Sequence, residues 1–146
     1  MDQSLPDPVY QAEFYADVPM KRALAWVVDA IVITLITLLI LPLTAFTGLF
    51  FLPLLFLTVS FVYRTFTISA RSATWGMRLF AIEFRDRAGR RFDLPTAFLH
   101  TLGYTLTISM LLPQIVSAAL MLTGARGQGL TDLVLGTVAI NRAAQK

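Results

Sequence analysis

Two long stretches without a charged side chain constrain this sequence more than any other feature. No Asp, Glu, Lys or Arg occurs between positions 30 and 63, and the stretch 94–125 contains only His100 as a group that could carry a charge near neutral pH. A core helix of a soluble domain need not exceed roughly 10–14 apolar residues, whereas crossing a bilayer takes about 20. The sequence therefore predicts an integral membrane protein.

The composition excludes several other classes. Apolar residues make up 56% of the chain and charged residues 14%, against about 25% charged residues in an average soluble domain. Cysteine is absent and there is one histidine, which excludes a disulfide framework and a cysteine- or histidine-rich metal site. The common hydrolase, zinc-protease and phosphate-loop motifs are also absent from the sequence. We therefore expect no enzyme activity and no cofactor, and the net charge of +3 indicates membrane topology rather than nucleic-acid binding.

Three apolar stretches define the expected membrane segments. The first covers residues 23–41, and the second covers residues 49–62, or 43–62 if the turn between them is tight. The third, residues 94–125, is too long for one upright span and too short for two complete spans with a turn. It is either one long kinked helix or a hairpin of two short helices, with Pro113 near its centre. The expected fold class is all-α, a polytopic helical membrane protein with three or four membrane segments.

A short basic loop follows the second stretch. Residues 64–93 contain seven arginines and three acids, and short loops rich in arginine stay in the cytoplasm. Within the loop, residues 75–80 predict a short interfacial helix, and LFAIEF followed by RDRAGRRF predicts a small β-hairpin that turns at residues 86–89. The N-terminal tail, residues 1–20, is expected on the same side. The arginines of the loop that could hold anionic lipid headgroups are Arg78, Arg85, Arg87, Arg90 and Arg91.

Asp29 is the most informative single residue, because it lies inside an otherwise apolar helix. A carboxylate there costs at least about 2.5–3.5 kcal/mol, so it should face protein or water and have a partner. Arg22 shares its helix face but lies about 10.5 Å away along the axis, too far for an easy pair. Two interpretations of Asp29 stay open, an ion or proton site and a buried structural pair. The partners that we predict for it are Arg71, Arg78, His100 and Arg126.

Two further polar residues adjoin apolar sequence. Asp132 opens the last apolar run, where an acid is typical of a helix N-terminal cap. His100 lies near the start of the third stretch, and a lone histidine there is more often an interhelical hydrogen-bond partner than a titrating site. Together with Arg22 and Asp29, these two residues are the candidates for a functional site.

The order of these residues resembles the RDD family of bacterial membrane proteins, which is named for one arginine and two aspartates. Arg22, Asp29 and Asp132 match the three namesake positions. Two departures occur, because Thr131 stands where the family often has histidine, and His100 stands where it often has a basic residue. The segments that carry the resemblance are KRALAWVVDAIVI, T-x-G-x-R at residues 74–78, D-x-x-G at residues 86–89, and LTDLVLGTVAI.

The resemblance implies a single helical membrane domain over residues 21–146, in a bacterial inner membrane with a cytoplasmic N-terminus. It also implies a link to transport, since transport of unidentified ligands has been suggested for the family and some members look like sodium–proton antiporters. Our leading hypothesis is a small transporter or transport-associated subunit that moves an ion or small solute. The alternative is a non-catalytic membrane scaffold, or an accessory protein that binds lipid or a partner. The expected partners are the bilayer and a second copy or another membrane protein.

Overall fold

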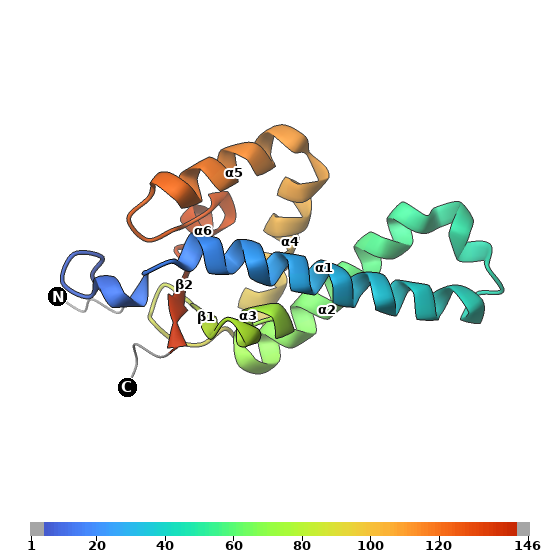
Figure 1. The fold of residues 1–146 in the computed structure, drawn as a ribbon, viewed down its shortest axis with the longest axis horizontal. Coiled ribbons are helices and arrows are strands. Elements are labelled where there is room, and N and C mark those ends of the chain that lie inside the picture. The colour runs from blue at the N-terminus through green and yellow to red at the C-terminus, as the bar shows by residue number, and fades with distance from the viewer. Residues whose placement is uncertain (1–4, 143–146) are drawn as a thin grey trace.

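The computed structural model describes residues 5–142, which form a set of helices and one small sheet (Figure 1). The elements in chain order are η1 (Ala12–Phe14), α1 (Val18–Leu43), η2 (Thr47–Phe51), α2 (Leu52–Arg71), α3 (Trp75–Leu79), β1 (Ile82–Arg85), α4 (Leu94–Ser109), α5 (Leu111–Thr123), α6 (Leu130–Leu135) and β2 (Val138–Asn141). The sheet lies at one end, and the α1–α2 hairpin extends away from it. The expected all-α fold class is confirmed.

Helices α1 and α2 arise from the first two apolar stretches. The 26 residues of α1 and the 20 residues of α2 are about 39 Å and about 30 Å long, enough to cross the hydrocarbon of a bilayer. The segments Ala12–Leu43 and Thr47–Arg71 are each long and apolar enough to be membrane spans. Large apolar side chains stay exposed along both helices, among them Leu39 at 73% and Leu54 at 64%. Such surfaces suit contact with lipid rather than water.

The third apolar stretch is two helices rather than one. Helix α4 ends at Ser109, α5 begins at Leu111, and the chain bends by 117° at the break. Pro113 explains the position of the break, because it has no N–H to donate to the carbonyl of Ser109 and its ring would clash with that carbonyl in a continuous helix. The two-helix alternative is therefore the observed one. The bent pair is a third candidate membrane span if it counts as one broken span.

The small antiparallel sheet has a different second strand from the one predicted. Strand β1 pairs with β2, so that Phe84 lies opposite Ala139. The predicted turn at residues 86–89 does form, held by backbone N–H groups that donate to Asp86, but the residues after it form no strand. All four residues of β2 are buried, and the charged RRFD segment that follows the turn could not fill that position without burying charges. The prediction of a local β-hairpin is therefore wrong.

Helix α3 forms where the short interfacial helix was predicted. It begins after Thr74, whose hydroxyl accepts a hydrogen bond from the N–H of Met77. It packs so closely on α1 that a Cβ atom at Gly76 would lie 2.2 Å from the carbonyl oxygen of Ala25. Glycine permits this approach because it has no side chain. As a result α3 is held against the middle of α1, beside Asp29.

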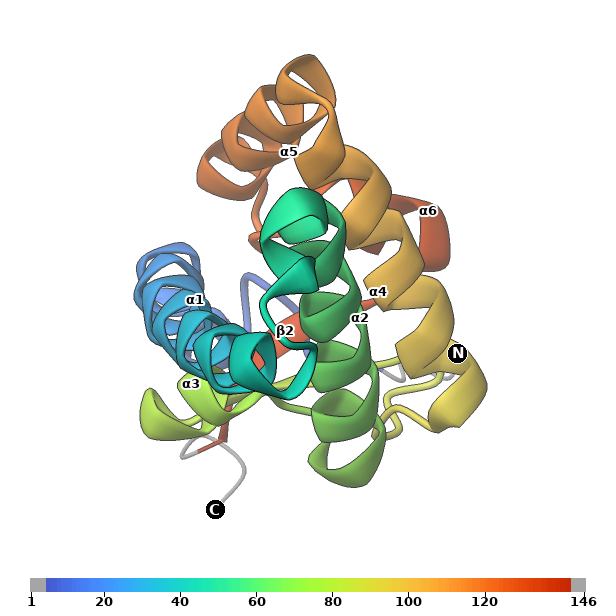
Figure 2. The ribbon, with the colours of Figure 1, turned by 90° about the vertical axis from the view of Figure 1, so that its right-hand side faces the viewer.

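The main core lies where the sheet meets α1, α2 and α4. Seen from the hairpin end, α1 and α4 lie on either side of α2 (Figure 2). The N-terminal segment packs on the sheet as well, because Tyr15 contacts Val138 and Ile140. The helices that carry Arg22, Asp29 and His100 are thus anchored in this buried core. The buried core residues are Val18, Ala25, Ile68, Ala73, Met77, Ile82, Phe84, Phe92, Ala97 and Ala139.

Candidate functional site

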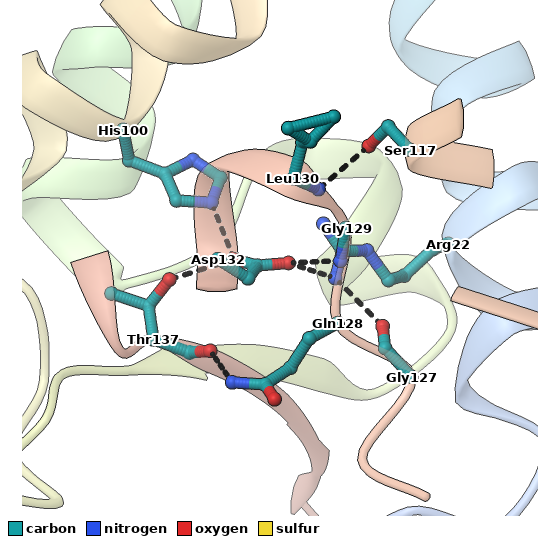
Figure 3. A network of polar contacts seen from close by, with 9 residues as sticks. All are labelled: Arg22, His100, Ser117, Gly127, Gln128, Gly129, Leu130, Asp132 and Thr137. Carbon is teal, nitrogen blue, oxygen red and sulfur yellow. Dashed lines mark hydrogen bonds and ion pairs between the residues drawn. The ribbon is translucent and has the colours of Figure 1, made fainter. Parts of the chain in front are cut away.

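Asp132 is the centre of a polar network that joins α1, α4 and α6 (Figure 3). Its Oδ2 atom forms an ion pair with Nη1 of Arg22 at 2.6 Å and accepts the N–H of Gly129 at 3.1 Å. Its Oδ1 atom accepts the hydroxyl of Thr137 at 2.7 Å and lies 2.8 Å from Nε2 of His100. The residue is 0% exposed. Both carboxylate oxygens are therefore fully engaged by groups of the protein.

The local sequence explains how this network forms. Helix α6 begins directly after Gly129, so Asp132 in its first turn reaches back to an N–H that has no partner within the helix. The helix-capping role predicted for Asp132 is confirmed, and so is the interhelical hydrogen bond predicted for His100. Burial alone would raise the pKa of Asp132, but the Arg22 guanidinium and then His100 outweigh it and hold this pKa below its usual range.

Asp29, near the middle of α1, has a separate set of partners. Its Oδ1 atom accepts the hydroxyl of Tyr63 at 2.7 Å and the N–H of Gly76 at 2.9 Å, and its Oδ2 atom accepts the hydroxyl of Thr74 at 2.6 Å. The nearest cation is Arg64, whose Nη1 atom is 3.9 Å from Oδ2. Asp29 is 1% exposed. Its three hydrogen bonds, at 2.6–2.9 Å, all come from neutral donors.

The cation beside Asp29 is one that we did not predict from the sequence, where Arg64 serves only to end the second apolar stretch. The position of the turn between α1 and α2 could have revealed it. Phe46 in this turn lies midway in the sequence between Asp29 and Tyr63, so antiparallel helices bring residues 63 and 64 beside Asp29. The predicted partners, which are wrong, were Arg71, Arg78, His100 and Arg126.

Both networks face one cavity of about 550 Å³, which lies between α1 and the bent pair α4–α5. A volume of this size is typical of small-molecule sites. Arg64 also lines it, with its guanidinium carbon 4.2 Å from the ring centroid of Tyr104. The hydroxyl of Tyr104 accepts the indole N–H of Trp26 at 2.6 Å. The candidate residues from the sequence that the structure brings together here are Arg22, Asp29, His100 and Asp132.

Two acids of the basic loop form ion pairs with arginines of the loop and with Arg142, which follows β2. Arg85, Arg91 and Arg142 all form ion pairs with Glu83, which is 0% exposed. Arg90 pairs with Asp86 at 3.4 Å. Of the five residues predicted to hold lipid headgroups, Arg78 and Arg85 are half-buried, and the three that remain exposed are Arg87, Arg90 and Arg91. Among residues 5–142, no group of three or more His, Asp or Glu side chains is arranged to hold a metal ion.

Comparison with known protein families finds a match to the RDD family. The model of the RDD family matches residues 16–136 of the 146, a range that includes Arg22, Asp29 and Asp132. The chain belongs to the RDD family. It is thus an RDD-family membrane protein with apolar helices long enough to span a bilayer. Searches of curated proteins and of solved structures find no match.

The three residues that carry the RDD resemblance fall into two networks. Arg22 pairs with the distant Asp132, while Asp29 on the same helix binds α2 and α3. Thr131, which stands where RDD sequences often have histidine, contacts α4, because a Cβ atom at Gly103 would lie 2.5 Å from its Cγ2 atom. The RDD signature is therefore split between two separate polar contacts on one cavity wall.

Proposed function

We propose that this RDD-family protein is a small transporter or transport-associated subunit of a bacterial inner membrane, in which an ion or small solute binds in the cavity between α1 and α4–α5. The observation that carries the proposal is the meeting of two buried ionic networks on the wall of one cavity, next to helices suited to span a membrane. Ionisable side chains inside a membrane are costly, and they commonly mark substrate or ion pathways.

The two networks support different roles in this proposal. Asp132 has a close counter-ion and three further contacts, so it holds α1, α4 and α6 together. Arg64 and Asp29 are 3.9 Å apart, beyond hydrogen-bond distance, so Arg64 can bind a solute beside Asp29. The N-terminus lies in the cytoplasm, and no reaction is catalysed. A second copy of the chain, or another membrane protein, completes the pathway, because so few helices enclose little space.

The test is ion flux by the purified chain in liposomes. Uptake of radioactive sodium and proton movement reported by a trapped pH dye are measured under an imposed gradient. We expect Asp29→Asn to lower the flux at least about tenfold, equivalent to 1.4 kcal/mol. The matched control is Asp93→Asn, at the exposed cap of α4, because asparagine caps a helix as well as aspartate does. Full flux in Asp29→Asn would contradict the role assigned to Asp29.

The alternative function is a membrane scaffold or an accessory protein that binds lipid or a partner, and the exposed arginines of the basic loop favour it. It predicts no flux above that of empty liposomes. It also predicts that Asp29→Asn only lowers the melting temperature. Replacing Arg87, Arg90 and Arg91 together by glutamine would then abolish binding to vesicles that contain an anionic lipid.

A further inference from the structure

Arg64 is a buried arginine whose donors the protein does not match. It is 9% exposed, and its Nε atom is buried with no hydrogen-bond partner among the described residues. Its Nη1 atom is 3.9 Å from Asp29, beyond hydrogen-bond distance, and the face of the guanidinium lies on Tyr104. A guanidinium carries five N–H donors around its edge, and leaving such donors buried without an acceptor is costly. Because Arg64 also lines the cavity, the arrangement points to an acceptor from outside the chain that meets its Nη atoms.

Asp29 does not fill this role, because its oxygens already accept three hydrogen bonds at 2.6–2.9 Å. Arg64 instead borders the cavity. On the same wall, Thr101 of α4 is 0% exposed, and its hydroxyl oxygen has no partner in the part of the chain that the structure describes. Two unmatched polar groups, from α2 and α4, therefore border one cavity.

The charges of the cavity wall select the ligand. Arg22 and Arg64 are balanced by Asp29 and Asp132, so the wall has a formal charge of zero. An organic cation offers no acceptor to the Arg64 donors, and a dianion such as a phosphate monoester would add two negative charges near the aspartates. A monoanion is the remaining class. Its body must be apolar, since the wall also includes Ala23, Val27, Ile68, Ile108, Met121 and Leu122.

We propose that the cavity binds a monocarboxylate with an apolar chain, with its carboxylate on Arg64 and its chain along the apolar wall. A carboxylate fits an arginine through two parallel N–H···O bonds. Trp26, Val27 and Leu122 line the cavity yet are 44%, 49% and 77% exposed. The apolar chain of the ligand can therefore enter the cavity beside these three residues. The inference names the solute class of the proposed transport site and rests on that proposal, but it is tested by binding rather than by flux.

The experiment measures equilibrium binding of radiolabelled decanoate to the full chain in phosphatidylcholine nanodiscs, with empty nanodiscs subtracted. We expect saturable binding to the native protein. Arg64→Gln should weaken it at least about tenfold, because a charge-assisted contact is lost. Arg64→Lys keeps the positive charge but cannot form two parallel hydrogen bonds, so its affinity for decanoate should fall by less than that of Arg64→Gln. Arg71→Gln is the matched control, because Arg71 is exposed at the end of α2 and does not line the cavity, and it should bind decanoate as the native protein does.

Competition on the native protein gives a test that does not depend on how the variants fold. Unlabelled decanoate should displace the label, decyltrimethylammonium should not, and decyl phosphate should require a higher concentration. Equal displacement by the cation, or equal affinity of folded Arg64→Gln and native protein, would overturn the proposal. Sodium flux without decanoate binding would overturn the carboxylate assignment alone, while decanoate binding without uptake of sodium, protons or decanoate into liposomes would overturn only the transport function.

Discussion

Asp29 and Asp132 are both buried carboxylates, yet the protein satisfies them in different ways. Asp132 has an arginine at 2.6 Å, whereas Asp29 has three neutral donors and an arginine at 3.9 Å. Short charge-assisted contacts favour the ionised carboxylate and hold it in one geometry. The looser contact leaves Arg64 with donors for a solute. The Arg22–Asp132 pair thus has a structural role, whereas Arg64 beside Asp29 has a binding role.

Asp132→Asn should destabilise the protein strongly. The change leaves Arg22, whose side chain is 13% exposed, without its counter-ion, and breaking a buried ion pair by removing one partner costs about 3–5 kcal/mol. Chemical and thermal unfolding of the detergent-purified protein measure this loss. Asp93→Asn should unfold at the same temperature and the same denaturant concentration as the native protein. Identical unfolding of all three proteins would mean that the Arg22–Asp132 pair does not hold α1 to α6.

The same carboxylate should make stability depend on pH. Its folded-state pKa lies below the ordinary value, so its ionised form contributes stability that is present above about pH 4 and is lost as the pH falls further. The melting temperature of the native protein should therefore drop below about pH 4. Asp132→Asn should lack this part of the drop. A drop of the same size in both proteins would assign the acid sensitivity to other groups.

At the scale of elements, the contact of α3 with α1 depends on one glycine. In Gly76→Ala, the new Cβ atom would lie 2.2 Å from the carbonyl oxygen of Ala25 and 2.9 Å from Oδ1 of Asp29. Because backbone atoms cannot yield as side chains do, α3 must move away and lose its N–H bond to Asp29. We expect a loss of about 3 kcal/mol, the upper part of the usual range for overpacking, measured by unfolding in detergent.

Gly48→Ala is the matched control for this change. Its new Cβ atom would meet only side-chain atoms of Leu41, Thr44 and Leu55, each at 3.1 Å. Flexible side chains can shift by a few tenths of an ångström, so stability should change by less than about 1 kcal/mol. If the two alanine variants are equally stable, the close packing of α3 on α1 is not what holds the loop in place.

The elements that could be predicted from the sequence are those that depend on local pattern. Long uncharged stretches predicted α1, α2 and the α4–α5 region, and Pro113 marked the region of the break. The partner of β1 could not be predicted in the same way, because Glu83 pairs with Ile140, far along the chain. A nearby segment looked equally suitable by pattern, and only burial in the assembled core distinguishes the two.

The candidate site follows the same rule. Residue type identified Asp29, His100 and Asp132, because charged and polar side chains are rare in or next to apolar segments, and the RDD resemblance added Arg22. Their pairing was not predictable from helix geometry within one segment, since each contact joins different elements. Arg64 was missed for a related reason: at the end of an apolar stretch an arginine is also a normal topology signal. Its burial becomes visible only when α4 packs beside α2 and places Tyr104 against it.

At the scale of the whole molecule, the two ends of the described chain are bonded to each other. The amide of Asn141 donates to the carbonyls of Glu13 at 2.9 Å and Ala16 at 2.8 Å, and its oxygen accepts from Nζ of Lys21 at 2.7 Å. These contacts tie β2 to the start of α1. Arg22 and Asp132, which lie far apart in the sequence, are brought together by this arrangement.

Our central claim is that a solute can reach the cavity inside the helices, and cysteine labelling tests it most directly. The chain has no native cysteine, so every signal comes from the introduced residue. Gln114 lies in the first turn of α5 and lines the cavity, at the far end of α4, which is about 24 Å long. Thr34 is exposed on the span α1, and Ala88 is exposed on the loop.

Each residue is changed to cysteine singly, and liposomes with the protein are treated with a charged, water-soluble methanethiosulfonate reagent. We expect Ala88→Cys to react, Thr34→Cys to be protected by lipid, and Gln114→Cys to react because the cavity admits water and solute to its deep end. If Gln114→Cys is as unreactive as Thr34→Cys while Ala88→Cys reacts, the cavity is sealed and the claim is contradicted.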